Sequence, residues 1–320
     1  MNMVSTKYTF LLPAYKIEFF KEALLSIKKQ SLNDFKVLVS DDCSPEDLRS
    51  VFDMVVGDDE RFTYRRNNVN MGGKSLVSHW NFLVDMCDTE FLIMASDDDF
   101  YEPTFLEEID SLVEKYPSVN LFRGRVRQID RYGELLNFDP LCVEYETQID
   151  FLYSTFCQKK IMCIANYVIR TDTLKKINGF VEFPLAWNSD DATIMLLSKN
   201  GGCNTSRIVL SFRSSGMNIS TNNECRVERM KASANYEFAL FYNSFYESIN
   251  KTLSKEESNR LAILNNNLRF SILNSIYEQS FLFKFNEWKK VYDYLKKNGK
   301  VRSKLQRLDF FLYWLKNRNN

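Results

Sequence analysis

Short apolar runs alternate with amphipathic stretches over the first 116 residues of the chain. Four of the apolar runs have the length of buried strands: residues 8–13, 35–42, 61–66 and 90–96. Between them, residues 18–30 and 74–87 repeat their apolar positions with the period of a helix. Ser44, Pro45 and Asp47 supply a cap, a favoured first helical residue and a capping box, which predicts one more helix start. This alternation is typical of a parallel sheet covered by helices.

The pattern is less regular beyond residue 116. Strand-like and helical stretches follow one another there at 120–130, 162–170, 171–180, 190–200 and 203–213. Asn178 and Gly179 give the helical stretch at 171–180 a left-handed end. From about residue 225 onward, helical periodicity dominates. We therefore predict an α/β domain with a mostly parallel or mixed sheet over residues 1–222 and a helical extension over residues 223–320.

Charge is balanced over the whole chain but not along it. The 320 residues include 42 basic and 42 acidic side chains, and this total gives no support to a nucleic-acid-binding role. Residues 281–320 hold eleven Lys or Arg against three acids, a difference of +8. The basic C-terminal stretch also carries several aromatic residues, so it predicts either a contact with an anionic membrane surface or a packing face within the protein.

The cysteines and the apolar runs indicate the cellular location of the protein. The seven cysteines are scattered, include no C-x-x-C pair and have no nearby histidine to complete a zinc site. Reduced, mostly buried thiols in an intracellular protein are the interpretation that we favour. The apolar run near the start is too short for a secretory signal, and nowhere do about 18 apolar residues run together without charge. We expect a cytoplasmic protein that does not span a membrane.

Carboxylates follow two of the predicted strands. Asp41 and Asp42 end the run "VLVSDD", and three more acids, Asp97 to Asp99, end the run "FLIMASDDD". Ligands of parallel α/β sheets bind outside the carboxyl ends of the strands, so these acids are expected at one edge. Hard oxygen ligands of this kind suit Mg²⁺ or Mn²⁺ bound to substrate phosphates. Acids that cap helices or form turns are the alternative for either motif alone.

Residues 10–47 resemble the amino-terminal signature of family-2 glycosyltransferases with the GT-A fold. In that family a Pro-x-Tyr turn, a helix ending in Ser-x-x-x-Gln-Ser/Thr and a strand ending in Asp-Asp-x-Ser form the nucleotide pocket. The chain has all three, as "PAY" at 13–15, "SIKKQS" at 26–31 and "DDCS" at 41–44. Residues 67–81 resemble the Asn-x-Gly-Gly segment of the family, and the resemblance as a whole covers about residues 7–215.

The resemblance implies a pocket for a UDP-sugar. Asp42 would hydrogen-bond the uracil, with the turn of Pro13, Ala14 and Tyr15 packed nearby. Further nucleotide-binding residues are expected in the Asn-x-Gly-Gly segment and after the last strand: Asn70, Gly73, Lys74 and Arg213. For Arg213, a solvent-facing side chain is the alternative.

The stretch "ASDDDFYEP" resembles the metal-binding motif of the family. Asp98 would ligate Mn²⁺ or Mg²⁺, while Asp97 and Asp99 would support the ribose and the metal. The usual first acid of the motif falls at Ser96, so the division of work among the three aspartates stays open.

The stretch "WNSDDATIMLLSKNGG" resembles the Glu-Asp pair that opens a helix in the family, and it places Asp191 at the position of the general base. Transfer of a sugar needs such a group, because the attacking hydroxyl must lose its proton as the diphosphate leaves. From the spacing alone, acids that interact with the helix macrodipole are the alternative.

The resemblance implies an inverting, metal-dependent hexosyl- or N-acetylhexosaminyltransferase of the bacterial surface-polysaccharide type. Its partners would be a UDP-sugar and a glycan or lipid-linked glycan acceptor. Two alternatives stay open: a sugar-phosphate nucleotidyltransferase, and a nucleotide- or glycan-binding protein without turnover. His79, the single histidine, is interpreted as structural, and no G-x-S-x-G elbow supports a hydrolase.

Overall fold

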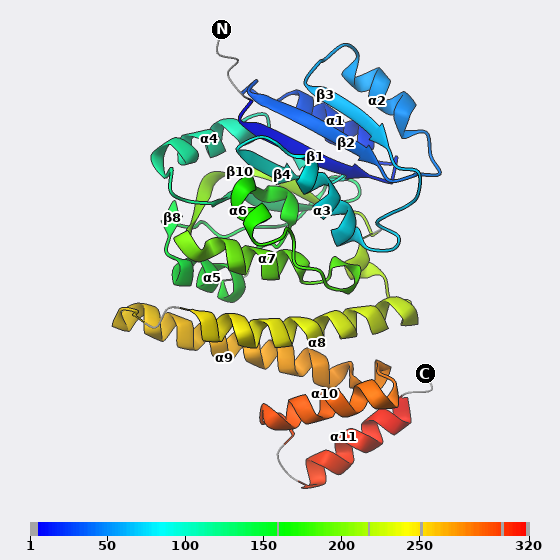
Figure 1. Cartoon of the computed structure of the whole chain (residues 1–320), viewed down its shortest axis with the longest axis vertical. Coiled ribbons are helices and arrows are strands. Elements are labelled where there is room, and N and C mark those ends of the chain that lie inside the picture. Colours follow the sequence, from blue (N-terminus) through cyan, green and yellow to red (C-terminus); the bar gives the residue numbers. More distant parts are fainter. Residues whose placement is uncertain (1–5, 159, 217, 250–251, 302–303, 318–320) are drawn as a thin grey trace. The chain divides into compact units, whose positions relative to one another are not determined.

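The computed structural model describes residues 6–158, 160–216, 218–249, 252–301 and 304–317 (Figure 1). The chain is divided into two compact units. The first comprises Met1–Glu182 and Ser189–Met217, and the second comprises Phe183–Asn188 and Asn218–Asn320. The second unit thus includes a six-residue segment that precedes the last part of the first unit in sequence.

The first unit contains the strands and most of the shorter helices. In chain order these are β1 (Tyr8–Ala14), α1 (Phe20–Lys28), β2 (Phe35–Asp41), α2 (Leu48–Val56), β3 (Phe62–Arg66), α3 (Leu76–Met86), β4 (Phe91–Met94), β5 (Phe100–Tyr101), α4 (Phe105–Lys115), β6 (Leu121–Asp130), β7 (Leu135–Phe138), β8 (Tyr145–Glu146), α5 (Gln148–Cys157), a 3-10 helix at Ile164–Asn166, β9 (Tyr167–Arg170), α6 (Thr171–Lys176), α7 (Ser189–Leu197), a 3-10 helix at Ser198–Asn200 and β10 (Gly202–Ser214).

One mixed sheet runs through this unit in the order β3-β2-β1-β4-β9-β6-β10-β5, with β7 paired to β6 and β8 to β10. Strands β1 to β4 are parallel to one another, and β9 is antiparallel to both β4 and β6. Strands β6 and β10 therefore run in the same direction as β1 to β4. The carboxyl ends of six strands meet at one edge of the sheet, which is where ligands of such sheets bind.

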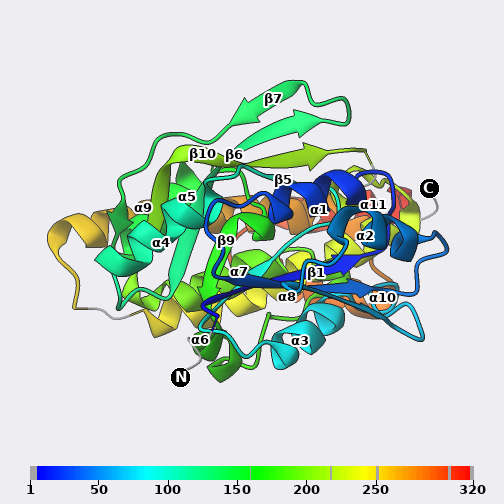
Figure 2. The ribbon, with the colours of Figure 1, turned by 90° about the horizontal axis from the view of Figure 1, so that it is seen from above.

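Helices cover both faces of the sheet. Figure 2 shows α1 and α2 on one face and α3 and α6 on the other. Alternate residues of β1 explain this, because Tyr8, Phe10 and Leu12 belong to the core cluster that includes α1 and α4. Leu11, between them, is fully buried as well. A strand that is apolar on both faces is typical of a parallel sheet with helices on each side. The predicted α/β fold is confirmed.

Several predicted boundaries are wrong in detail. The helix expected to begin at Ser44 begins at Leu48, and Asp47 is its cap, with its side chain accepting from the Ser50 N–H. The Ser44 hydroxyl is used elsewhere, because it donates to the Tyr15 carbonyl (2.6 Å). Of the strand expected at 162–170, only residues 167–170 form a strand, and a 3-10 helix occupies Ile164–Asn166.

The hairpin of β6 and β7 is an exposed edge of the first unit. Strand β7 pairs with β6, and its four residues are all exposed. Apolar side chains that are at least 40% exposed lie along it and beyond it, at Tyr132, Leu135, Leu136, Phe138, Leu141, Val143 and Tyr145. Strand β7 and the residues that follow it therefore present many apolar side chains to solvent.

The second unit is helical. It contains a 3-10 helix at Pro184–Ala186, another at Ile219–Thr221, α8 (Cys225–Ser248), α9 (Lys255–Glu278), a third 3-10 helix at Ser280–Leu282, α10 (Phe285–Lys297) and α11 (Lys304–Asn317). Trp288 of α10 packs against Phe310 and Trp314 of α11, with ring centroids 5.4 and 5.3 Å apart. All three rings are at least 90% buried, so these basic-tail aromatics form a core within the unit. Among the described helices, none has the length and hydropathy needed to cross a bilayer.

Candidate active site

The predicted site residues gather where the parallel strands end. The turn after β1 lies beside the acids that follow β2, because the Asp42 N–H donates to the Ala14 carbonyl (2.8 Å). It also lies beside the acids after β4, because the N–H groups of Tyr15 and Lys16 both donate to Asp97 Oδ2 (2.8 Å each). Residues expected from sequence alone to share one pocket are therefore hydrogen-bonded to one another.

The Asp42 carboxylate accepts hydrogen bonds from the loop that follows β3. Its Oδ1 accepts from the Met71 N–H (2.8 Å) and from Asn67 Nδ2 (2.9 Å), and its Oδ2 accepts from the Gly72 N–H (2.7 Å). A Cβ at Gly72 would lie 2.9 Å from Asp42 Oδ2, so the close approach requires glycine. The carboxylate thus orders the Asn-x-Gly-Gly segment, whose Asn70, Gly73 and Lys74 are exposed.

The buried side chain of His79 lies beside Asp42. The imidazole is 1% exposed, with Nδ1 3.6 Å from Asp42 Oδ2 and Nε2 2.9 Å from Ser40 Oγ. Burial lowers the pKa of this histidine, so the neutral ring is favoured. A neutral ring with its proton on Nδ1 donates toward Asp42 and accepts the Ser40 hydroxyl proton at Nε2. The interpretation of His79 as a structural residue agrees with this geometry.

The three aspartates after β4 point to different partners. Asp97 accepts from the turn after β1, as described above. Asp98 is 5% exposed, and its Oδ1 accepts from the Ser96 hydroxyl. Asp99 is 2% exposed and accepts from the Arg213 N–H (3.0 Å) and from Cys163 Sγ (3.5 Å).

The negative charges of neighbouring carboxylates make ionisation of Asp97 and Asp99 less favourable. Burial and the Asp98 charge raise the pKa of Asp97 to about 6. The same two causes hold the pKa of Asp99 well above its usual range. A cation among them would remove this cost, since an opposite charge within a few ångströms favours the ionised form.

The fit to a divalent metal can be judged from these contacts. Among the described residues, no three His, Cys, Asp or Glu side chains gather closely enough to hold an ion by themselves. Both oxygens of Asp99 already accept hydrogen bonds, whereas Asp98 accepts one, at Oδ1. A site with one or two carboxylates completed by substrate phosphates is the usual arrangement for Mg²⁺. Asp98 fits that arrangement better than Asp99 does.

Arg213 ties the acidic turn to its neighbours. Its Nε donates to the Asp98 carbonyl (3.2 Å), its Nη1 to the Arg131 carbonyl (3.3 Å) and its Nη2 to Glu22 Oε2 (2.7 Å). The guanidinium also lies 4.2 Å from the ring centroid of Phe19, and the side chain is 3% exposed. The solvent-facing alternative does not describe this buried arginine, and the contact with phosphate stays a prediction.

Asp190 and Asp191 lie in the first turn of α7. Asp191 Oδ1 is buried and accepts no hydrogen bond from the described residues, so it retains an unused acceptor. Burial, with the Asp190 charge as a second cause, holds the pKa of Asp191 well above its usual range. A carboxyl group with a raised pKa and an unused oxygen is a candidate general base.

Cys163 connects the two acidic groups. Its thiol donates to Asp99, and burial raises the pKa of Cys163, with the charges of Asp99 and Asp190 as further causes. The aspartates after β4 and those of α7 therefore flank the same buried thiol. No sequence signal pointed to Cys163, nor to Glu22 and Arg131, because their role depends on contacts made only in the folded chain.

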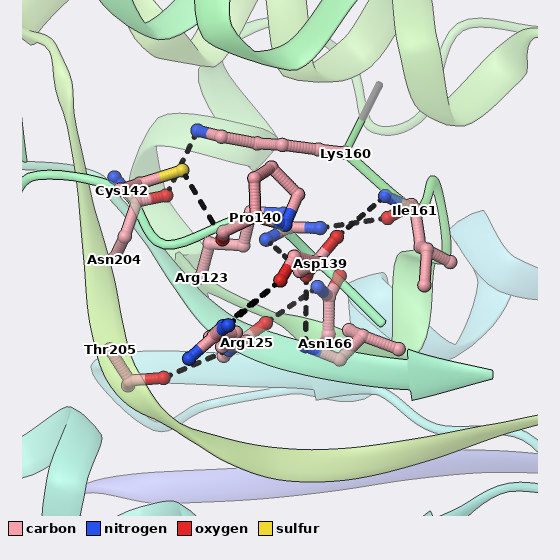
Figure 3. A network of polar contacts seen from close by, with 12 residues as sticks. Arg123, Arg125, Asp139, Pro140, Cys142, Lys160, Ile161, Asn166, Asn204 and Thr205 are labelled. Atoms are coloured by element: carbon pink, nitrogen blue, oxygen red, sulfur yellow. Dashed lines mark hydrogen bonds and ion pairs between the residues drawn. The ribbon is translucent and has the colours of Figure 1, made fainter. Parts of the chain in front are cut away.

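A buried ionic network fixes the segment between β7 and β9 (Figure 3). Asp139 forms an ion pair with Arg123 (2.7 Å), and both side chains are at most 1% exposed. Asp139 also accepts from the Val126 N–H (2.8 Å) and the Ile161 N–H (2.6 Å). Lys160 pairs with Glu146 (2.9 Å) in the same region. The sequence offered no rule for this segment, yet the structure shows that its two ends are firmly held.

Comparison with known proteins agrees with the fold and the motifs. Residues 9–165 match the family described as "Glycosyl transferase family 2". Among curated protein sequences, none matches the chain.

Solved structures share the fold at low sequence identity. Staphylococcus aureus TarS 1–349 in complex with UDP-GlcNAc is 15% identical with a TM-score of 0.57, and the alignment covers 91% of this chain and 88% of that one. The mannosyltransferase PcManGT from Pyrobaculum calidifontis, in complex with GDP-Man and Mn²⁺, is 12% identical with a TM-score of 0.53, covering 98% and 86%. The chain therefore has the GT-A fold with C-terminal helices, and the family match supports a glycosyltransferase.

Proposed function

We propose that this chain is an inverting glycosyltransferase that moves a sugar from a UDP donor to a hydroxyl of a glycan or lipid-linked glycan. The observation that carries the proposal is the hydrogen-bonded assembly of three sequence motifs at one sheet edge: the turn at 13–16, the acids after β2 and the acids after β4. TarS, a structural neighbour crystallised with UDP-GlcNAc and with UDP, supports the choice of UDP.

The nucleotide would lie against the turn after β1 and the loop that Asp42 orders. Tyr15, 40% exposed, offers a ring beside this edge. Asp42 already accepts three hydrogen bonds, so a uracil N–H must share one of its oxygens or displace the loop. Gly73 and Lys74 are exposed next to it and are available to phosphate.

Asp98 would hold the divalent cation together with the diphosphate, and Asp97 and Asp99 would fix the turn around it. Bound there, Mn²⁺ or Mg²⁺ supplies positive charge that stabilises the departing diphosphate. The PcManGT complex with Mn²⁺ supports this choice. Arg213 would act by holding the acidic turn in place through Asp98, Asp99 and Glu22.

Asp191 would take the proton from the attacking hydroxyl. Its unpartnered Oδ1 can accept a hydrogen bond from the acceptor sugar, and its raised pKa makes it a stronger base than an ordinary aspartate. Attack from the face opposite the diphosphate inverts the anomeric centre. The acceptor would meet the segment between β7 and β9, where the buried network of Figure 3 provides a fixed surface.

A peripheral contact with an anionic membrane is a further part of the proposal. It is supported by four exposed lysines of α10: Lys289, Lys290, Lys296 and Lys297. Phe285, which is 56% exposed, begins the same helix. Basic helices with an apolar residue at the margin bind anionic lipid surfaces.

The test is release of UDP from a panel of UDP-sugars by the purified chain with simple sugar acceptors, in Mn²⁺, Mg²⁺ or EDTA. We expect release from one donor that depends on metal and acceptor. UDP binding without release from any donor would favour the binding protein without turnover. Absence of both binding and release would contradict the UDP assignment. Consumption of a nucleoside triphosphate with a sugar phosphate would favour the nucleotidyltransferase.

A further inference from the structure

The residues that precede α7 have an unusual backbone. Leu185, Ala186 and Asn188 all have left-handed φ values, of 61°, 57° and 64°. Side-chain-bearing residues rarely adopt this region, and three within four residues persist only when the surroundings enforce them. We call residues 183–188 the pre-helix segment. It ends one residue before Ser189, the start of the helix that carries Asp191.

Helix α8 supplies the contacts that hold the pre-helix segment. Asn235 Oδ1 accepts from Trp187 Nε1 (3.1 Å) and from Asn188 Nδ2 (2.9 Å). Lys231 lies 5.2 Å from the indole centroid of Trp187. The ring of Phe183, at the other end of the segment, packs edge-on against Phe238 with centroids 6.1 Å apart.

The spacing of these contacts explains how one helix can make them all. Lys231, Asn235 and Phe238 stand at positions i, i+4 and i+7, so they lie on one face of α8. Asn235 is itself fixed, because its Nδ2 donates to Gln279 Oε1 at the end of α9 (2.8 Å). The amide therefore presents its oxygen to the segment in one orientation.

The segment is closely connected to the first turn of α7. The Val181 N–H donates to Thr193 Oγ1 (2.9 Å), and the Thr193 hydroxyl donates to the Ser189 carbonyl (2.6 Å). These bonds close a loop from 181 to 193 at its base. Asn188, the last residue of the pre-helix segment, is bonded directly to Ser189, so the backbone conformation of the segment sets the direction in which the chain enters α7.

We infer that Asn235 is a positioning residue for Asp191, because it holds the left-handed pre-helix segment and thereby sets the start of α7. The link to catalysis rests on the proposed function. The C-terminal helices then have a role in the reaction, since they supply the residue that fixes the segment before the general base. Displacing a catalytic group by about 1 Å can cost on the order of 100-fold in rate, so the effect is measurable.

The first test compares Asn235→Ala with Asn243→Ala. Asn243 lies two turns further along α8, where its amide donates to Tyr294 Oη (3.0 Å), so this control removes an equivalent bond away from the segment. We expect Asn235→Ala to lower kcat at least tenfold while the Kd for UDP stays within about twofold. Trp187→Phe, which removes the indole N–H and keeps a ring, is expected to lower kcat less. Asn243→Ala is expected to keep the wild-type kcat.

A second readout does not depend on turnover. Amide hydrogen exchange of peptides that cover 183–191 should be faster in Asn235→Ala and unchanged in Asn243→Ala. Equal kcat in Asn235→Ala and wild type, equal losses in both variants, or unchanged exchange at 183–191 would each overturn the inference. If wild-type protein neither binds UDP nor releases it, the proposed function fails, while the exchange experiment still decides whether Asn235 holds the segment.

Discussion

Asp191 combines burial with an unpartnered oxygen, and this combination has a cost as well as a use. Its raised pKa means that the folded state binds the proton more tightly than the unfolded state does. As pH rises above about 3.8, the ordinary value, the folded protein must ionise a carboxyl group that its surroundings disfavour. The free energy of unfolding therefore falls with rising pH, until the group is ionised in both states.

Asp191→Asn should separate this cost from the catalytic use. We expect the variant to lose at least about 100-fold in kcat, the usual contribution of a general base, and to keep UDP binding. Its Tm should exceed that of wild type at pH 8, and the gain should shrink towards pH 4. The wild-type kcat should fall on the acid side at a higher pH than an ordinary aspartate would give. Normal transfer by Asp191→Asn would contradict the base assignment.

Asp98 and Asp99 differ in the hydrogen bonds that they accept within the protein. Asp99 accepts two hydrogen bonds from buried groups, so Asp99→Ala should lower the Tm as well as the activity. Asp98→Ala removes a carboxylate that accepts from Ser96 and that repels its neighbours, so its Tm should be little changed or higher. Calorimetric titration with UDP should show that Asp98→Ala no longer responds to Mn²⁺. A metal-stimulated UDP affinity equal to wild type would exclude Asp98 as a ligand.

The positions of the site residues were easier to predict from the sequence than their contacts. The position of Asp42, Asp97 and Asp98 at one sheet edge was predictable, because each acid directly follows a buried parallel strand. The use of Asp42 to order the 67–73 loop was not, since it depends on backbone N–H groups that come near only when the loop folds back. The contact between Arg213 and Glu22 was not predictable either, because the two residues lie nearly 200 positions apart in sequence and meet only in the folded chain.

At the scale of elements, the strands with continuous apolar runs were the easiest to predict. Runs such as 8–13 and 90–96 are buried on both faces, so their composition alone identifies them. Strand β7 carries apolar residues that are exposed, and α5 lies in a stretch with little periodicity, so neither was predicted. The helix start at Ser44 was wrong because Asp47 caps the helix, while the Ser44 hydroxyl accepts from the Glu46 N–H and donates to the turn after β1.

The ion pair between β6 and the segment after β7 makes a prediction about stability. Asp139→Ala would leave Arg123 buried without its carboxylate, and losing one partner of a buried pair costs about 3 to 5 kcal/mol in the free energy of unfolding. Replacing both residues, as in Arg123→Met with Asp139→Leu, should cost less than the single change. Chemical denaturation measures the comparison. A double variant less stable than Asp139→Ala would show that the network contributes more than charge compensation.

At the scale of the whole molecule, basic side chains are concentrated in residues 281–320, while Trp288, Phe310 and Trp314 of the same stretch are core residues. We expect binding to vesicles that contain phosphatidylglycerol, weakening as salt is raised. Charge reversal on α10, Lys289→Glu with Lys296→Glu, should abolish sedimentation with the vesicles. Lys199→Glu, an exposed lysine of the first unit, is the control and should still bind. Equal binding to neutral phosphatidylcholine vesicles would contradict an electrostatic contact.

The exposed apolar residues of β7 also affect the solubility of the protein during purification. Excluded salts such as ammonium sulfate strengthen the association of apolar surface, and an unpaired strand edge can accept a further strand. Preparations should therefore be salted out early, be retained on phenyl resin and lose homogeneity on concentration. Crystallisation trials would start most productively at low salt, and a charge placed at Leu136 is the first change to make for sample quality.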